Sequence, residues 1–394
     1  MKRTTIGILL ALFSFTLAAV LQASTATRTK PPVRAARATA KAPASAARPA
    51  LSSKRTPAAR RRVYRSPWNE PSYADSTSGD RTEGEDLTVR ASAVAALGPY
   101  HGSVVVVDPH SGRILSIVNQ KLAFRSGFQP CSTIKIVAAL AALSEGIIER
   151  GTAMRLGRHT TINLTEALAR SNNPYFAHLG VKLGFDRVHY YSRLFGLGEK
   201  AGLNIPEEEP GILPSSPPAN GGVGMMMSFG EGISQTPLEL AALLSAIANG
   251  GTLHYLQYPR TLQEAEHFVP RVKRHLDIAQ WIPEIKPGLM GAVEFGTARR
   301  AAYDPNEPIY GKTGTCTDKR EAGTHLGWFG SFNDVNGQRL VVVVLLTGGH
   351  AVNGPVASGI AGNVYRGLSS RNFFAGQRAT SPVALISTGN CCNW

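Results

Sequence analysis

Apolar residues along this chain form two groups of β-like segments, separated by a long and mostly helical stretch. Ser103–Val107 and Arg113–Val118 are rich in β-branched residues and flank a turn-forming segment, which predicts a hairpin. Much later, three more apolar runs predict strands at Ile309–Thr315, Leu326–Phe332 and Gln338–Thr347. Strands at both ends with helices between them predict an α+β domain whose sheet joins the two ends of the domain.

Helical spacing of apolar residues appears on both sides of these strands and between them. Leu87–Leu97 and Val356–Leu368 carry this spacing at the two ends. Between the strand groups, Thr236 and Glu239 form a capping box at the start of a helix, and Gly250 lies just beyond its end. We therefore expect a helix-rich middle section inserted into the sheet.

The pattern divides the chain into four parts. Residues 1–26 combine two basic residues, the apolar run Ile6–Leu21 and small residues after it, which predicts a secretory signal peptide or a short signal anchor. Residues 27–85 are rich in Ala, Pro and Arg and predict a disordered linker. We expect the folded domain at 86–368 and a loose tail at 369–394.

The net charge of +15 comes from the N-terminal part of the chain. Residues 1–69 hold 14 Lys and Arg and no acidic residue, so subtracting them from 42 leaves 28 basic against 27 acidic residues. The nearly neutral remainder argues against nucleic-acid binding. The basic linker is either a contact with anionic lipid or wall polymer, or a plain solvated spacer.

The first candidate motif is Ser132-Thr133-Ile134-Lys135, at the start of an apolar helical run. Residues three apart share one face of a helix, so Ser132 and Lys135 can meet. A serine hydroxyl needs a base to become a nucleophile, and a lysine can be that base where burial lowers its pKa. The alternative is an ordinary Ser and Lys at helical spacing.

The second motif is Ser171-Asn172-Asn173, between helical segments. A hydroxyl at Ser171 can relay a proton, and the amide of Asn173 can both donate and accept a hydrogen bond. Helix capping is the simpler explanation for this motif taken alone.

The third motif is Lys312-Thr313-Gly314-Thr315, on a predicted strand. Lys312 and the hydroxyls of Thr313 and Thr315 can hold a carboxylate, and Gly314 lets a substrate or another backbone approach closely. A solvated edge strand that happens to carry a lysine is the alternative.

The three motifs in this order resemble the penicillin-binding protein and serine β-lactamase superfamily. Stretches at Leu194–Pro206, Gly230–Gly251 and Gly311–Phe332 resemble penicillin-binding transpeptidases as well, and the likeness covers about residues 87–368. It implies an α+β, β-lactamase/transpeptidase-like fold, with a five-stranded antiparallel sheet flanked by helices plus a helical lobe. The active site would lie between the sheet and the lobe.

The resemblance also implies a role for each motif residue. Ser132 resembles the acylated nucleophile and Lys135 its general base. Ser171 resembles the proton relay and Asn173 the contact to the substrate amide. The implied carboxylate and substrate-binding site consists of Lys312, Thr313, Gly314 and Thr315.

The implied enzyme is a serine D,D-transpeptidase or D,D-carboxypeptidase acting on peptidoglycan stem peptides, and β-lactams would acylate the same serine. No metal or cofactor is implied. A serine β-lactamase is the first alternative, weakened because the family's deacylating motifs are not apparent. A β-lactam or muropeptide sensor is an alternative of another class. The leader predicts export to the periplasm or cell envelope, with a membrane tether if the N-terminal segment is retained.

The chain has four cysteines. Cys131 and Cys316 match the positions of a disulfide in class A serine carbapenemases, so the resemblance implies a Cys131–Cys316 bond; two buried thiols are the alternative. Export is compatible with a disulfide. Cys391 and Cys392 are adjacent in the tail, where a bond between neighbours is strained, so a free or intermolecular role is expected.

Overall fold

The computed structural model describes residues 68–318 and 323–375. The predicted signal segment, most of the predicted linker and the cysteines 391 and 392 lie outside the described residues. None of the described helices is long and apolar enough to cross a membrane.

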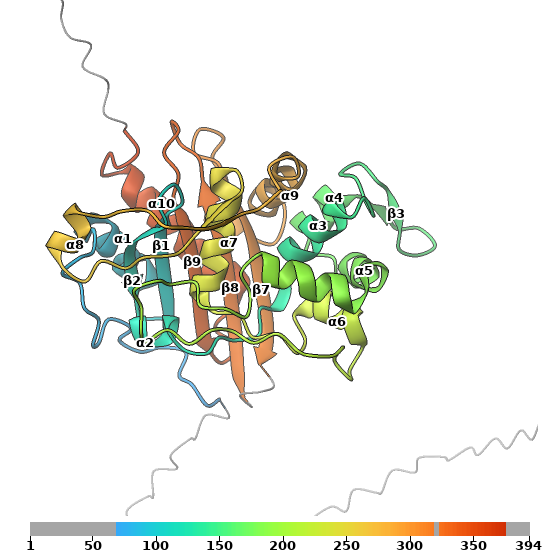
Figure 1. Ribbon diagram of the computed structural model, residues 1–394, viewed down its shortest axis with the longest axis horizontal. Helices are drawn as coiled ribbons and strands as arrows, with labels where there is room; N and C mark the ends of the chain where they lie inside the picture. Colours follow the sequence, from blue (N-terminus) through green and yellow to red (C-terminus); the bar gives the residue numbers. More distant parts are fainter. Residues whose placement is uncertain (1–67, 319–322, 376–394) are drawn as a thin grey trace, which may run out of the picture. The chain divides into compact units, whose positions relative to one another are not determined.

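A five-stranded antiparallel sheet forms the centre of the fold, in the order β2-β1-β9-β8-β7 (Figure 1). Its strands are β1 (Gly102–Asp108), β2 (Arg113–Val118), β7 (Ile309–Asp318), β8 (Thr324–Asn333) and β9 (Val341–Gly348). The predicted α+β fold with this sheet is confirmed. All five expected strands are present, although β9 begins three residues later than expected and β7 continues three residues further.

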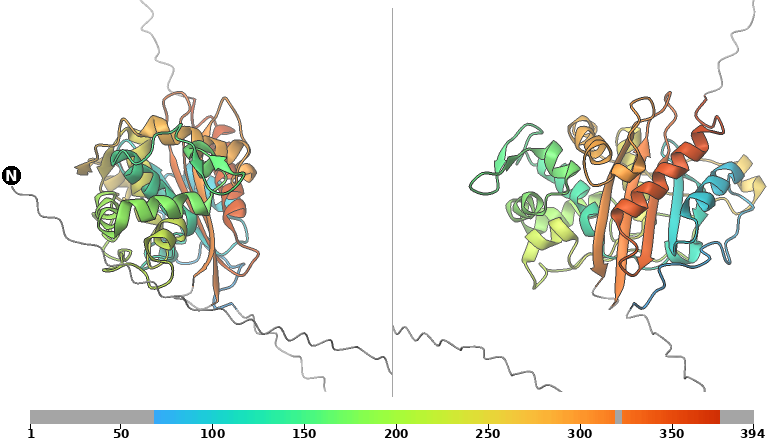
Figure 2. Two further views of the ribbon diagram at one scale, coloured as in Figure 1. Left: turned by 90° about the vertical axis from the view of Figure 1, so that its right-hand side faces the viewer. Right: turned by 180° about the vertical axis from the view of Figure 1, so that it is seen from behind.

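Both faces of the sheet are buried, which explains the unbroken apolar runs in its central strands. In β1, Val105 and Val107 belong to the core beneath α7 (Pro237–Asn249), while Val104 and Val106 belong to the core beneath the two terminal helices. Those helices are α1 (Leu87–Leu97) and α10 (Gly354–Ser369). Figure 1 shows α7 over one face, and the right-hand view of Figure 2 shows α10 across the other.

A helical lobe lies beside strand β7, at the edge of the sheet (Figure 1). Its elements are η1 (Cys131–Ile134), α3 (Lys135–Ser144), β3 (Met154–Arg155), β4 (Thr161–Ile162), α4 (Leu164–Ala169), α5 (Asn173–Leu194), α6 (Gly222–Phe229) and α9 (Ile282–Glu294). The remaining short elements are α2 (Gln120–Ala123), β5 (Thr252–His254), α8 (Leu262–Glu266), β6 (Val272–His275) and η2 (Arg299–Ala301).

The capping box expected at the start of α7 is present. The hydroxyl of Thr236 accepts from the backbone of Glu239, whose carboxylate accepts in return from the backbone N–H of Thr236. Glu239 is fully buried and also accepts from the N–H groups of Gly198 and Gly211. Burial raises the pKa of this carboxyl to about 8. One capping residue thus holds two neighbouring loops against the helix.

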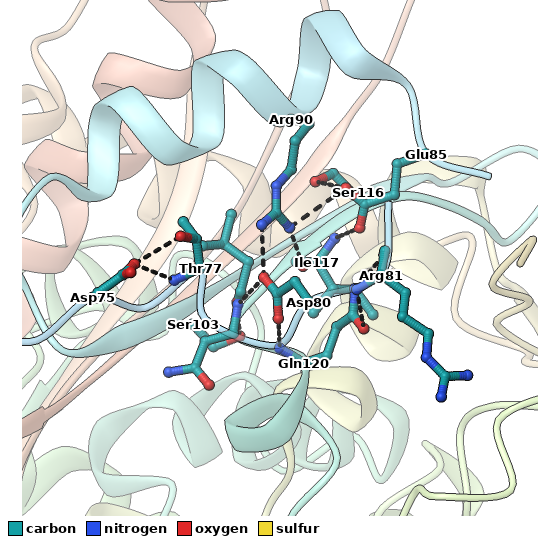
Figure 3. Close-up of polar contacts among 12 residues, drawn as sticks. Asp75, Thr77, Asp80, Arg81, Glu85, Arg90, Ser103, Ser116, Ile117 and Gln120 are labelled. Atoms are coloured by element: carbon teal, nitrogen blue, oxygen red, sulfur yellow. Dashed lines mark hydrogen bonds and ion pairs between the residues drawn. The ribbon is translucent and has the colours of Figure 1, made fainter. Parts of the chain in front are cut away.

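The expected linker boundary at residue 85 is wrong, because residues 68–85 pack on the domain. Figure 3 shows the buried polar cluster that fastens this segment. The Arg90 guanidinium on α1 donates to Asp80 at 2.7 Å and lies 3.5 Å from Glu85. Glu85 in turn accepts from the Ser116 hydroxyl and the Ile117 N–H on β2, each at 2.9 Å. Buried charges need such partners, so the segment is part of the folded unit.

The expected tail boundary is also too early. Helix α10 continues to Ser369, and Phe374 is buried against the core that it shares with α1. The two apolar residues after the helix, Phe373 and Phe374, gave no clear signal in the sequence that they pack on the domain.

A disulfide at Cys131 and Cys316 joins η1 to β7, with Cα atoms 5.7 Å apart. The two residues are 185 positions apart in sequence, so the link closes a very long loop. A link of this kind restricts the unfolded chain and ties the helical lobe directly to the edge strand.

Replacing Arg90 by Ala should destabilise the domain by about 3 kcal/mol, because it leaves two buried carboxylates without their cation. Urea unfolding of the purified domain measures this loss. Arg187→Ala is the matched control, since its ion pair with Glu145 is exposed and should contribute less than about 1 kcal/mol. Equal effects of the two substitutions would contradict the proposed anchoring role of the cluster.

Peptide mapping without reductant should recover Cys131 and Cys316 in one linked peptide pair, in a variant that lacks Cys391 and Cys392. Reduction of that variant should lower the free energy of unfolding by about 2–5 kcal/mol, because the closed loop is long. Recovery of both thiols free from the unreduced protein would show that the bond does not form.

Candidate active site

The fold brings the three sequence motifs together where the lobe meets the sheet. Ser132 lies in η1, Ser171 and Asn173 lie at the start of α5, and Lys312 lies on β7. Figure 1 shows β7 at the sheet edge, beside the lobe that contains α3 and α5. Residues separated by more than a hundred positions are therefore neighbours.

The first motif is not the single helix that its sequence predicts. Its first turn is a 3-10 helix, and the α-helix begins only at Lys135. Side chains three apart eclipse one another in a 3-10 helix. The Ser132 hydroxyl and the Lys135 amine accordingly lie 3.0 Å apart.

The Lys135 amine is surrounded by oxygen atoms. Besides Ser132, it contacts the Ser171 carbonyl at 2.8 Å, the Ser171 hydroxyl at 3.0 Å and the Asn173 amide oxygen at 2.5 Å. Four oxygens exceed the three N–H bonds of an ammonium group. Two of them are carbonyl oxygens, which can only accept, and two are hydroxyls, which can also donate. A neutral amine can donate to the two carbonyl oxygens and accept from one hydroxyl, so it also serves three of the four oxygens.

The surroundings favour that neutral state. Burial, with the positive charge of Lys312 as the smaller cause, lowers the pKa of Lys135 to about 6. The face of the Phe176 ring, whose centre lies 5.6 Å from the amine, is a weaker influence in the opposite direction. No carboxylate of the described residues pairs with this lysine, so no ion pair there offsets the cost of burying its charge.

Backbone geometry directs the second motif toward Lys135. Ser171 is left-handed, with φ 55°, so its carbonyl and its hydroxyl both reach the amine. Asn172 caps α5 by accepting from the N–H of Tyr175 at 2.9 Å. The capping interpretation is therefore correct for Asn172, while the neighbours on either side of it contact Lys135. A left-handed non-glycine residue costs about 1–2 kcal/mol, which the surrounding contacts must offset.

Lys312 is a second buried cation. Its amine donates to the Thr313 carbonyl at 3.1 Å, and burial lowers its pKa to about 7. In the part of the chain that the structure describes, no carboxylate lies within ion-pair distance of it. The amine keeps donors available for an anion.

The sequence suggests that both hydroxyls of the third motif can hold a carboxylate, but in the fold the two have different surroundings. Thr313 and Thr315 alternate with Lys312 along β7 and therefore share the opposite strand face. The Thr313 side chain is buried, and its hydroxyl pairs with that of Thr297 at 2.6 Å. Thr313 is thus a poor candidate for a substrate contact. Thr315 is exposed, and its hydroxyl accepts from the Gly354 N–H at 2.8 Å, at the start of α10.

Gly314 is required by close packing. A Cβ atom there would lie 2.9 Å from the Pro130 carbonyl and 3.2 Å from the Cys131 Cβ. Trp328 on β8 supports the same loop, because its indole N–H donates to the Gln129 carbonyl at 3.0 Å. The predicted close approach is therefore that of the nucleophile loop itself.

Thr297 is a residue of this region that the sequence gave no reason to select. Besides its bond to Thr313, its N–H donates to the Ala169 carbonyl at 3.1 Å, two residues before Ser171. It links the second and third motifs through one backbone and one hydroxyl contact. A lone threonine in a loop carries no spacing signal that could have revealed this.

Comparison with known proteins agrees with the resemblance that the three motifs indicate. Residues 102–366 match the family model of the penicillin binding protein transpeptidase domain. Stage V sporulation protein D of Bacillus subtilis is 30% identical over 291 residues, which cover 66% of this chain and 44% of that relative. The chain thus spans less than half the length of this curated relative.

Two solved structures are similar in fold. The D,D-transpeptidase domain of a peptidoglycan glycosyltransferase from Eggerthella lenta has a TM-score of 0.58 at 21% identity, covering 73% of this chain and 82% of that one. Penicillin-binding protein A from M. tuberculosis has a TM-score of 0.59 at 22% identity, covering 72% and 78%. With a family model that spans most of the chain and three motifs gathered in one site, the chain belongs to the penicillin-binding protein transpeptidase family.

Proposed function

We propose that this chain is a penicillin-binding D,D-transpeptidase or D,D-carboxypeptidase that acts on peptidoglycan stem peptides through an acyl-enzyme at Ser132. The observation that carries the proposal is the set of four oxygens around the Lys135 amine. A neutral amine there can donate to the two carbonyl oxygens of Ser171 and Asn173. Its lone pair is then left for the proton of a hydroxyl.

In this mechanism Lys135 is the general base for Ser132. At 3.0 Å the amine is within hydrogen-bond distance of the serine hydroxyl, and a pKa of about 6 keeps it unprotonated near neutral pH. The Ser132 oxygen attacks the carbonyl carbon of the D-Ala-D-Ala bond while its proton passes to Lys135. The backbone N–H groups of Ser132 and Thr315 are the proposed donors to the developing oxyanion.

The leaving D-alanine needs a proton on its amine. We assign this relay to Ser171, whose hydroxyl lies 3.0 Å from the same Lys135 amine. Lys312 is the proposed site of the terminal carboxylate, and Asn173 can offer its amide N–H₂ to the substrate backbone. Thr313 lies on the opposite strand face and supports this site through its bond to Thr297, rather than contacting the substrate.

An amine or water then takes the acyl group from Ser132, which gives cross-linking in the first case and trimming in the second. β-Lactams would acylate the same serine. Penicillin-binding protein A from M. tuberculosis has been solved as an imipenem acyl-enzyme, which supports this part of the proposal.

We also propose export, with the N-terminal segment as signal peptide or tether and the basic linker facing anionic lipid or wall polymer. The 14 Lys and Arg residues of positions 1–69, without an acidic one, suit such a surface. The periplasm or the cell envelope is the compartment where stem peptides occur and where the Cys131–Cys316 bond would persist.

A labelled penicillin should form a long-lived adduct with the full chain, visible by intact mass, and Ser132→Ala should abolish it. Ser216→Ala, on an exposed loop, is the matched control and should form the adduct at the normal rate. Rapid release of hydrolysed drug would identify a β-lactamase instead. A stable adduct without release of D-alanine from peptide substrates would favour a sensor.

The second-order rate of penicillin acylation should depend on pH with a bell shape. The rate should rise as Lys135 loses its proton near pH 6, and fall as Lys312 loses its proton near pH 7 and no longer attracts the carboxylate. Stopped-flow or quenched acylation between pH 5 and 9 measures both limbs.

The variant Lys312→Gln tests which lysine causes each limb of this pH profile. It should remove the falling limb and move the rising limb to higher pH, because the like charge that lowers the Lys135 pKa is gone. A profile that stays flat from pH 5 to 8 in the wild type would contradict a lysine base.

A further inference from the structure

Arg170 and Phe295 form an exposed stacked pair beside the second motif. The Arg170 guanidinium carbon lies 5.6 Å from the centre of the Phe295 ring. Both side chains are exposed, Phe295 to 41%. A guanidinium stacked on an aromatic face keeps the N–H donors at its edge free for a planar anion.

The pair lies between the second and third motifs. Arg170 directly precedes Ser171, so their Cα atoms are about 3.8 Å apart. On the other side, the loop after Phe295 presses on the same place: a Cβ atom at Gly296 would lie 2.1 Å from the Ala169 carbonyl. One residue further on, Thr297 contacts Thr313 on β7. The loop contacts therefore fix Phe295 beside the residue that carries the guanidinium.

The guanidinium of Arg170 has no anionic partner among the described residues. No carboxylate there lies within ion-pair distance of its guanidinium, and no side-chain hydrogen bond is formed. The acidic neighbours in sequence, Glu166 one turn earlier and Glu294 before Phe295, do not pair with it either. Together with the buried Lys312, Arg170 gives the site cationic groups at two separate places.

We propose that Arg170 and Phe295 recognise a second carboxylate on a peptide substrate, distinct from the terminal carboxylate assigned to Lys312. This inference rests on the proposed function and adds to it a preference for an acidic over an amidated substrate. Two sources share that chemistry: a side-chain carboxylate of the acyl donor, and a carboxylate of the amine that accepts the acyl group.

Two substrate series test the proposal and separate these sources. In the donor series, two synthetic peptides ending in D-Ala-D-Ala differ only in a carboxylate or a carboxamide on the residue before the first D-alanine. In the acceptor series, one thioester donor is combined with an amine peptide that carries either a carboxylate or its amide. The ratio of kcat/KM between acidic and amidated partners is measured in each series.

The wild type should prefer the acidic partner about tenfold in one of the two series, as expected for a charge-assisted bidentate contact. Arg170→Gln should bring that ratio to within about twofold of one. Arg158→Gln should keep the full ratio: it removes the same charge from the same lobe, and its side chain pairs with no described residue. Thermal unfolding of Arg170→Gln by circular dichroism checks that the variant is folded.

Phe295→Leu provides a second, independent variant. It should reduce the preference for the acidic partner while leaving Arg170 in place, because the guanidinium loses the ring on which it is stacked. A ratio near one in both series of the wild type would overturn the inference, and so would a preference that survives Arg170→Gln. A wild type that penicillin cannot acylate at Ser132 would instead overturn the proposed function, so the two failures are distinguishable.

Discussion

The protonation state of one buried amine is the constraint on which the rest of this site depends. Lys135 has no exposed surface and four oxygen neighbours, two of which are carbonyl oxygens that can only accept. A protonated amine at this place would be a buried charge without a carboxylate, which is costly. A neutral amine satisfies both carbonyl oxygens and leaves its lone pair for a hydroxyl. The hydrogen-bond partners of Lys135 suit a neutral amine, and the cost of burying an unpaired charge favours it.

The elements around Lys135 are arranged to keep that geometry. The 3-10 turn at Cys131–Ile134 places Ser132 over the amine, and the left-handed backbone of Ser171 turns two oxygens toward it. Cys131 is also left-handed, with φ 52°, directly before Ser132. Strain at two such residues persists only where the surroundings fix them. The link to Cys316 and the absence of a side chain at Gly314 let β7 supply that support at close range.

Local patterns predicted the strands and the capped helix α7, while the resemblance to penicillin-binding transpeptidases implied the five-stranded sheet and the gathering of the three motifs. Neither could predict contacts that depend on the tertiary fold. Glu208 lies in a run of three glutamates, a pattern typical of solvated loop charge, yet it is buried and accepts from the N–H groups of Ala201 and Gly202. Thr297 was likewise invisible, because its partner Thr313 is brought beside it only by the packing of α9 against β7. Burial of residues 68–85 was missed because this stretch is polar and rich in Gly and Ser, although it is acidic where the stretch before it is basic.

The positive charge of Lys312 affects the pKa of Lys135. Which cause lowers that pKa most therefore decides whether Lys135 could still act as a base once a substrate is bound. A substrate carboxylate paired with Lys312 would cancel much of the positive charge that this residue directs at Lys135. That loss alone would raise the Lys135 pKa and work against its role as a base. Burial, however, is the larger cause of the lowered pKa, and the Lys312 charge is the smaller one. A bound peptide also excludes water from the cleft, which strengthens the larger cause. Under the proposed mechanism, Lys135 would therefore stay neutral in the complex because it is desolvated, while Lys312 would be available to bind the carboxylate.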